Sequence, residues 1–289
     1  MKLTLPDKSI RDLKNGSTGF DLANDIGPGL AKAAVAVSVD GVQKDLHDPI
    51  MHDANISIIT IDSEEGLEIM RHTLAAQVLA RAVKNLYPKS KLAIGPTIKD
   101  GFYYDVECKE TISIDDLKKI EKEMDKIVKT KSSITKKLLS KRDALKVFKD
   151  KDESYKEEII NDSDQKDQFQ LYYQDDEDFV DLCKGPHLPN LNFIGAYKLT
   201  TISGAYWKGD SSNTMLTRIY GTAWSNEKDL NEHLNNIEEA QKRDHRKLGK
   251  EMDLFHFQDE APGMVFWHPN GWSIYRNLRN FVRKRLQEN

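Results

Sequence analysis

Ala34-Val35-Ala36-Val37-Ser38-Val39-Asp40-Gly41 is the stretch that decides how the first part of the chain folds. Its first six residues are small or apolar and include three valines, a composition that favours a strand. Asp40-Gly41 follows directly, and an Asp-Gly pair is the strongest short signal for a hairpin because both residues tolerate a positive φ. We therefore predict a strand that ends in a tight turn.

The residues around this turn predict a small independent α+β unit over residues 1–62. A short strand begins at Leu3, and a last strand runs through residues 56–61. Thr18 is a suitable N-cap for a brief helix, which Gly27-Pro28-Gly29 would end. Strands around one helix in so short a chain are typical of a ubiquitin-like β-grasp fold.

A long amphipathic helix is expected next. Asp62 and Glu65 can cap its start, and Tyr87-Pro88 stops it. Apolar side chains recur along it every three or four positions, which predicts one buried face. These side chains are Leu67, Met70, Leu74, Val78, Ala82 and Leu86.

The rest of the chain predicts further strands and helices without internal repeats. Strands are expected at residues 92–96 and 101–106, followed by a second amphipathic helix capped by Ser113. From there to about Trp224 the pattern indicates short strands and loops, and a third helix starts near Ser225. The fold class is therefore α+β and multidomain, as expected for 289 residues.

Composition excludes several classes of function. A net charge of −4 gives no whole-chain attraction to nucleic acid, so any RNA contact must come from local basic patches. The longest apolar runs are too short to span a bilayer, and no apolar segment of a signal peptide follows Met1. Two cysteines do not make a disulfide framework, which favours the reducing cytoplasm. We expect neither DNA nor a membrane as partner.

The last helix, from about Trp272, has an apolar face with no later element to cover it. Ile274, Leu278, Phe281 and Val282 make up this face. We expect the chain to be a fragment that is cut early in a further domain.

Cys183-Lys184-Gly185-Pro186-His187 is the strongest chemical motif. A cysteine and a histidine four residues apart can converge on one metal ion or one polarised water. His72, on the long predicted helix, is the candidate for the opposite side of such a site.

The chain resembles threonyl-tRNA synthetases over essentially its whole length. Five stretches in the same order carry the resemblance. They are Ala93-Ile94-Gly95-Pro96 with Gly101-Phe102-Tyr103-Tyr104-Asp105, Asp181 to His187, Gly204-Ala205-Tyr206-Trp207-Lys208-Gly209-Asp210, Arg218-Ile219-Tyr220-Gly221-Thr222-Ala223-Trp224, and Glu260-Ala261-Pro262-Gly263-Met264-Val265-Phe266-Trp267-His268.

This resemblance implies a TGS domain (1–62), an editing domain of the kind shared with alanyl-tRNA synthetases (63–224) and a linker helix (225–247). The beginning of a class II catalytic core with an antiparallel sheet (248–289) would follow. The family charges tRNA(Thr) with threonine, uses ATP, Mg²⁺ and Zn²⁺, and dimerises through the class II core. The sites for these cofactors would lie beyond Asn289, so this stretch alone is not expected to aminoacylate.

The resemblance also implies a site that hydrolyses Ser-tRNA(Thr). His72, Cys183 and His187 would hold a water, or a metal that activates it. Lys156 could stabilise negative charge or the leaving 3′-oxygen, and Asp181 could orient a histidine or bind the seryl amine. Other cysteines and histidines are interpreted as structural, as are Tyr103 and Tyr104, whereas residues 242–250 could touch tRNA phosphates.

One departure from the family concerns its His-x-x-x-His pair on the long helix. His72 is present, but Ala76 or Gln77 stands where the second histidine is expected, because this sequence has one additional residue there. A shifted helix or a single-turn π-bulge could absorb it, and a bulge would bring Gln77 beneath His72. Since glutamine is neither a base nor a good zinc ligand, we predict weaker editing and no tight metal site.

Two alternatives remain open from the sequence. One is a free-standing hydrolase that edits mischarged tRNA in trans, against which stands the core-like stretch from Glu260 onward. The other is a non-catalytic tRNA-binding protein, which the altered helix favours.

Overall fold

The computed structural model describes residues 1–175 and 179–288. The chain divides into two compact units, Met1–Leu230 and Asn231–Asn289, and the division falls within helix α8 (Glu227–Lys242). No helix of the described residues is long and apolar enough to cross a membrane.

The first unit begins with a mixed five-stranded sheet in the order β2-β1-β5-β3-β4. Strands β3 (Ala34–Val39) and β4 (Val42–Asp45) form the predicted hairpin, with φ of 50° at Asp40 and 82° at Gly41. The strands β1 (Lys2–Thr4) and β5 (Ala54–Thr60) run parallel, whereas the other neighbours are antiparallel. Strand β2 covers Ile10–Asp12.

Two helices accompany this sheet. Thr18 caps α1 (Gly19–Ile26) in a reciprocal capping box with Asp21, as the sequence predicts. The expectation of a single helix is wrong, because α2 (Pro28–Ala33) follows with its proline in the first turn, where the missing N–H costs no hydrogen bond. Leu22 of α1 and Val37 of β3 are fully buried in the same apolar cluster, which completes the predicted β-grasp.

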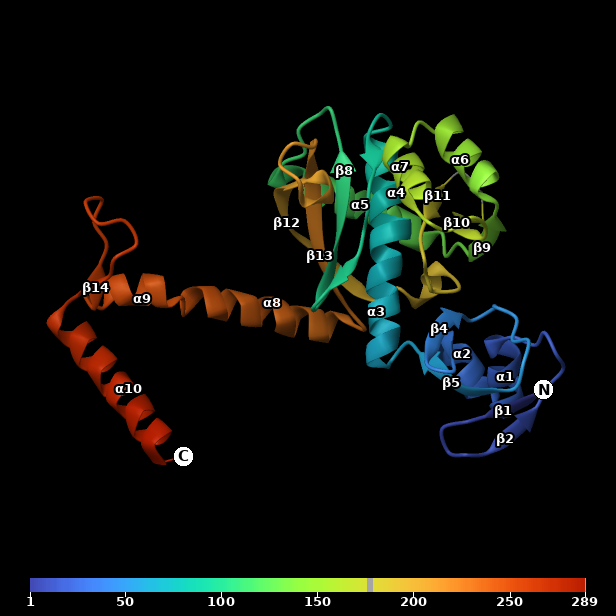
Figure 1. Cartoon of the computed structure of the whole chain (residues 1–289), viewed down its shortest axis with the longest axis horizontal. Coiled ribbons are helices and arrows are strands. Elements are labelled where there is room, and N and C mark those ends of the chain that lie inside the picture. The colour runs from blue at the N-terminus through green and yellow to red at the C-terminus, as the bar shows by residue number, and fades with distance from the viewer. Residues whose placement is uncertain (176–178, 289) are drawn as a thin grey trace. The chain divides into compact units, whose positions relative to one another are not determined.

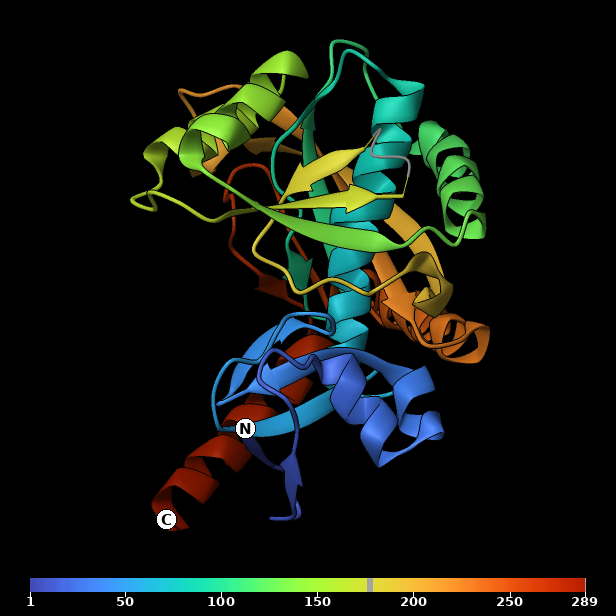
Figure 2. The same ribbon diagram turned by 90° about the vertical axis from the view of Figure 1, so that its right-hand side faces the viewer.

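A long helix continues the chain in three segments: α3 (Glu64–Thr73), a π-helical turn (Leu74–Leu79) and α4 (Ala80–Leu86). Ser63 rather than Asp62 caps it, since the Ser63 side chain accepts the Gly66 N–H at 3.0 Å. Its apolar residues are almost all buried in the main core. Figures 1 and 2 show this helix lying between two sheets of the first unit.

One of these sheets has the order β12-β13-β8-β6, with β7 also paired to β8. The helix α5 (Leu117–Lys129) packs beside it. Its strands are β6 (Lys91–Leu92), β7 (Thr97–Ile98), β8 (Gly101–Glu107), β12 (Ala196–Tyr206) and β13 (Met215–Trp224).

The other sheet has the order β11-β10-β9, built from β9 (Ile134–Leu139), β10 (Phe169–Gln174) and β11 (Val180–Leu182). Helices α6 (Lys141–Asp150) and α7 (Ser154–Asp162) correct the expectation of strands and loops alone in this region. Each is short and highly charged, so its few buried residues, such as Phe148 and Ile160, give a weak periodic signal.

The second unit contains the rest of α8, then α9 (His245–Glu251), the short strands β14 (Phe255–His256) and β15 (Phe266–Trp267), and α10 (Pro269–Glu288). The α10 side chains Ile274, Leu278, Phe281 and Val282 are exposed.

Candidate functional site

The long helix supplies the first side chain of the site at the end of α3. His72 lies just before the π-helical turn, in which the Ala80 N–H bonds the Ala75 carbonyl five residues back. A π turn frees a carbonyl from the helical ladder. The Gln77 carbonyl accepts a bond of 2.6 Å from the Gln174 Nε2 on β10. The turn is therefore held from the neighbouring sheet.

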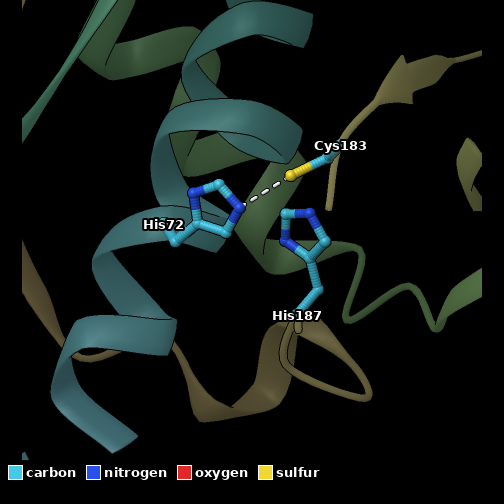
Figure 3. Close-up of side chains that lie close together, drawn as sticks. All are labelled: His72, Cys183 and His187. Carbon is cyan, nitrogen blue, oxygen red and sulfur yellow. Dashed lines mark hydrogen bonds between the residues drawn. The ribbon is translucent and has the colours of Figure 1, made fainter. Parts of the chain in front are cut away.

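The loop after β11 supplies the other two side chains, Cys183 and His187. Gly185 has a φ of 66°, and a Cβ at this position would lie 1.9 Å from the Tyr172 Oη. Only glycine permits this close approach. The loop is thereby pressed onto β10, and both side chains turn toward the long helix (Figure 3).

The three side chains converge. Their ligand atoms all lie within 4.8 Å of one another. The His72 Nε2 and the Cys183 Sγ are hydrogen-bonded at 2.7 Å, and the rings of His72 and His187 stack with centroids 4.7 Å apart (Figure 3). The sequence thus identified residues that the fold brings together from the helix and the loop.

Thr73 fixes the proton position on His187. Its hydroxyl donates to the Ile69 carbonyl at 2.8 Å, so its oxygen can only accept from the His187 Nδ1 at 3.2 Å. Neutral His187 then carries its proton on Nδ1 and a free lone pair on Nε2. This Nε2 is buried and has no hydrogen-bond partner within the described ranges.

His72 is held in its neutral form. Desolvation by burial lowers its pKa below the ordinary histidine value, although the charge of Asp181 and a hydrogen bond with the Gly95 backbone act in the opposite direction. A neutral imidazole near pH 7 can accept a proton.

Lys156 and Asp181 lie close by as a buried ion pair. The Lys156 Nζ is 2.5 Å from the Asp181 Oδ1, and both side chains are at most 3% exposed. The Tyr104 hydroxyl donates to the Asp181 Oδ2 at 2.9 Å and accepts from the Lys156 Nζ at 3.1 Å. Burial and the Asp181 carboxylate raise the pKa of Tyr104, so this phenol remains a donor.

A cavity of about 460 Å³ joins these groups. Its walls include the side chains of His72, Lys156, Asp181 and Cys183, together with apolar residues such as Ile94. This volume suits a small molecule or the end of a larger one. The site therefore offers a base, a thiol and a charged pair around one enclosed space.

The two candidates for the missing histidine lie differently. Ala76 lines the cavity, whereas Gln77 is fully buried and is not among the described lining residues. Neither amide atom of Gln77 has a hydrogen-bond partner in the described part of the chain. The expected π turn is present, but Gln77 does not contribute its side chain to the cavity.

A metal could be held by His72, Cys183 and His187, which match the three protein ligands of a catalytic zinc site. Two ligands of one tetrahedral zinc lie roughly 3.5 Å apart, given bonds of 2.0–2.3 Å. The distance of 2.7 Å between the His72 and Cys183 ligand atoms is shorter. An ion would therefore have to separate this hydrogen-bonded pair.

Three neighbours of the site were not recognised from the sequence as its parts: Thr73, Tyr104 and Tyr172. Tyr104 is buried in the strand core as expected, yet its hydroxyl contacts the ion pair. Tyr172 packs edge-on against the His187 ring at 4.3 Å. Nothing in their local sequence marks these contacts.

Comparison with known proteins agrees with this arrangement. The model of the TGS domain matches residues 1–60, and the model of the threonyl and alanyl tRNA synthetase second additional domain matches residues 170–220. The chain is 50% identical over 287 residues to a threonine–tRNA ligase of Prochlorococcus marinus (strain MIT 9211). It is 51% identical over 282 residues to that of Legionella pneumophila subsp. pneumophila and 46% identical over 287 residues to that of Psychrobacter cryohalolentis.

These alignments cover 98–99% of the chain but 44% of the length of each relative. The chain thus spans less than half of these relatives. The resemblance predicted from the sequence motifs is confirmed: the chain carries a TGS domain and the second additional domain of threonyl-tRNA synthetases, and nearly all of it matches threonine–tRNA ligases.

Proposed function

We propose that this chain is part of a threonine–tRNA ligase and that its cavity hydrolyses serine from wrongly charged tRNA(Thr). The observation that carries the proposal is the enclosed cavity lined by His72, Cys183 and the Lys156–Asp181 pair. The alignment with threonine–tRNA ligases along nearly the whole chain supplies the substrate class.

A second, hydrolytic site has a physical reason. A pocket built for threonine cannot strongly reject serine, because one methyl group is worth only about 1–3 kcal/mol. An ester bond between serine and the 3′-oxygen of the tRNA must then be cut after it forms.

The residues of the cavity suit this reaction. A water held by His72 and Cys183 attacks the carbonyl carbon of the ester while the His72 imidazole takes its proton. The tetrahedral intermediate then releases the 3′-oxygen, which takes a proton back from His72 as the carbon–oxygen bond breaks. His187 packs against the His72 ring and keeps it oriented.

Lys156 and Asp181 supply charge at the cavity wall. The ammonium of Lys156 can stabilise the negative charge of the intermediate. Asp181 is paired with Lys156 and Tyr104 rather than with a histidine, which favours binding of the seryl amine over orientation of a ring. A zinc ion on His72, Cys183 and His187 would supply a more acidic water.

We assign residues 1–62 to the TGS domain, 63–224 to the editing domain, 225–247 to the linker helix and 248–289 to the start of a class II catalytic core. The whole ligase would use ATP, Mg²⁺ and Zn²⁺, bind threonine and tRNA(Thr), and act as a homodimer. Such a ligase works in the cytoplasm, where tRNA is charged for translation.

The direct test is to incubate the chain with tRNA(Thr) carrying labelled serine and to measure the serine released. We expect release faster than in buffer, and loss of that release in His72→Ala. His47→Ala is the matched control, because His47 packs on Phe20 in the TGS domain with ring centroids 5.3 Å apart.

Release no faster than in buffer would remove the hydrolytic proposal and favour a non-catalytic tRNA-binding protein. Parallel measurement with threonyl-tRNA(Thr) tests the specificity. A free-standing hydrolase is distinguished by the coding frame, which would then not continue into the ATP-binding motifs of a ligase.

A further inference from the structure

The loop that carries Cys183 and His187 rests on a carboxylate of the TGS domain. Asp45, at the end of β4, accepts the His187 backbone N–H on its Oδ1 at 2.8 Å. Its Oδ2 accepts the Tyr172 hydroxyl at 2.7 Å. All these residues belong to the same compact unit.

Through these two bonds Asp45 acts on both sides of His187. The backbone bond fixes where the loop passes, and the Tyr172 ring, held by the second bond, packs edge-on against the imidazole at 4.3 Å. Gly185 lies against the same Tyr172 hydroxyl. One carboxylate therefore sets the position of the loop, of its glycine turn and of its histidine.

The surroundings of Asp45 suit a permanently ionised acceptor. The Lys136 Nζ lies 2.8 Å from the Asp45 Oδ2 and 2.5 Å from the Asp48 Oδ2. Desolvation works to lower the pKa of Lys136, but the hydrogen bonds to Asp45 and Asp48 outweigh it and raise that pKa. The Asp45 and Lys136 side chains are each only 15% exposed, so solvent competes weakly for these bonds.

We propose that Asp45 is a positioning residue of the hydrolytic site, so that the TGS domain is a structural part of that site. This inference rests on the proposed hydrolysis of seryl-tRNA(Thr). Asp45 touches no reacting atom, and it acts by holding the loop against the long helix, where Cys183 meets His72. A TGS domain that only tethers the chain to RNA would not require this contact.

Asp48 provides the matched control. It also pairs with Lys136 across the same boundary, but the structure gives it no hydrogen bond to His187 or Tyr172 within the described residues. If the carboxylates merely join the two domains, Asp45→Ala and Asp48→Ala should behave alike. If Asp45 positions the site, only Asp45→Ala should disturb it.

The test measures serine release from seryl-tRNA(Thr) by the whole chain and its variants. We expect kcat to fall by about 10- to 100-fold in Asp45→Ala, the range that a small misplacement of catalytic groups costs. Asp48→Ala should keep most of its rate. Asp45→Asn should recover part of the loss, because its amide oxygen still accepts the His187 N–H.

Equal loss in Asp45→Ala and Asp48→Ala, or no loss in either, would overturn the proposal. A second readout does not need activity: NMR of labelled histidines should show the His187 ring signals shifting in Asp45→Ala and not in Asp48→Ala. If the unmodified chain releases no serine, the proposed function fails, while the ring signals still decide whether Asp45 positions His187. Unshifted His187 signals in a folded Asp45→Ala would overturn the inference.

Discussion

Replacing Gln77 by methionine should stabilise the protein without slowing hydrolysis. Gln77 is fully buried in the π-helical turn, and its side-chain amide has no hydrogen-bond partner within the residues that the structure describes. Burying an unsatisfied polar group costs about 1–3 kcal/mol, and methionine has nearly the same length without that cost. We expect the free energy of unfolding to rise by about that amount.

Gln174 is the matched control, since it is equally buried but fully used. Its Nε2 donates to the Gln77 carbonyl and its Oε1 accepts from the Arg81 guanidinium, each at 2.6 Å. Gln174→Met removes both bonds and leaves a carbonyl of the π turn unsatisfied. We expect this variant to lose about 1–3 kcal/mol of stability.

Thermal unfolding measures both effects, with a shift of about 2–4 °C expected for each kcal/mol in a unit of this size. Serine release from seryl-tRNA(Thr) is measured on the same samples. A lower Tm in Gln77→Met would show that its amide is hydrogen-bonded after all. A hydrolysis rate that falls with an unchanged Tm would show that Gln77 works in the cavity and would refute the placement of Ala76 there instead.

Further predictions concern the ion pair, the metal and an arginine clamp. Lys156→Met leaves the Asp181 carboxylate buried without its partner and should destabilise the protein by about 3–5 kcal/mol in urea unfolding, with adding Asp181→Asn recovering part of it; equal stability of both variants would contradict a coupled pair. The purified chain should hold substoichiometric zinc by metal analysis, and Ala76→His, unlike Gln77→His, should increase it, because only position 76 lines the cavity; one tightly bound zinc in the unmodified chain would be the opposite result. Arg218→Lys should lower Tm despite the retained charge, since lysine cannot keep both bonds to Asp105 (2.7 and 2.8 Å) or the stacking on Tyr103 at 3.9 Å; an unchanged Tm would show that charge alone matters there.

The parts of the fold that follow from neighbouring residues could be predicted. The hairpin at Asp40-Gly41 needs only two residues that accept positive φ, and the Thr18 cap needs only its own first turn. The π turn at Leu74–Leu79 was among the two options for an additional residue within a helix. Periodicity failed at α6 and α7, because each buries few side chains and its burial is decided by β10.

The site was predicted only in part for the same reason. His72, Cys183 and His187 carry chemistry that is visible in the letters, and the resemblance to threonyl-tRNA synthetases added Lys156 and Asp181. Their pairing with each other, through Tyr104, could not be predicted, because these residues come from α7, β11 and β8. The choice between Ala76 and Gln77 depends on how the helix is rotated against the cavity.

The sequence by itself determined the β-grasp hairpin, the long helix, the Cys183–His187 motif and the family to which these stretches are similar. Each of these depends on local backbone preferences or on residue identities in order. Only the tertiary structure decided that Cys183 meets His72 across 111 residues and that Asp45 holds His187 across 142. Contacts over such separations depend on how whole elements pack, and one carboxylate at the end of a short strand carries no local sign of the histidine it will support.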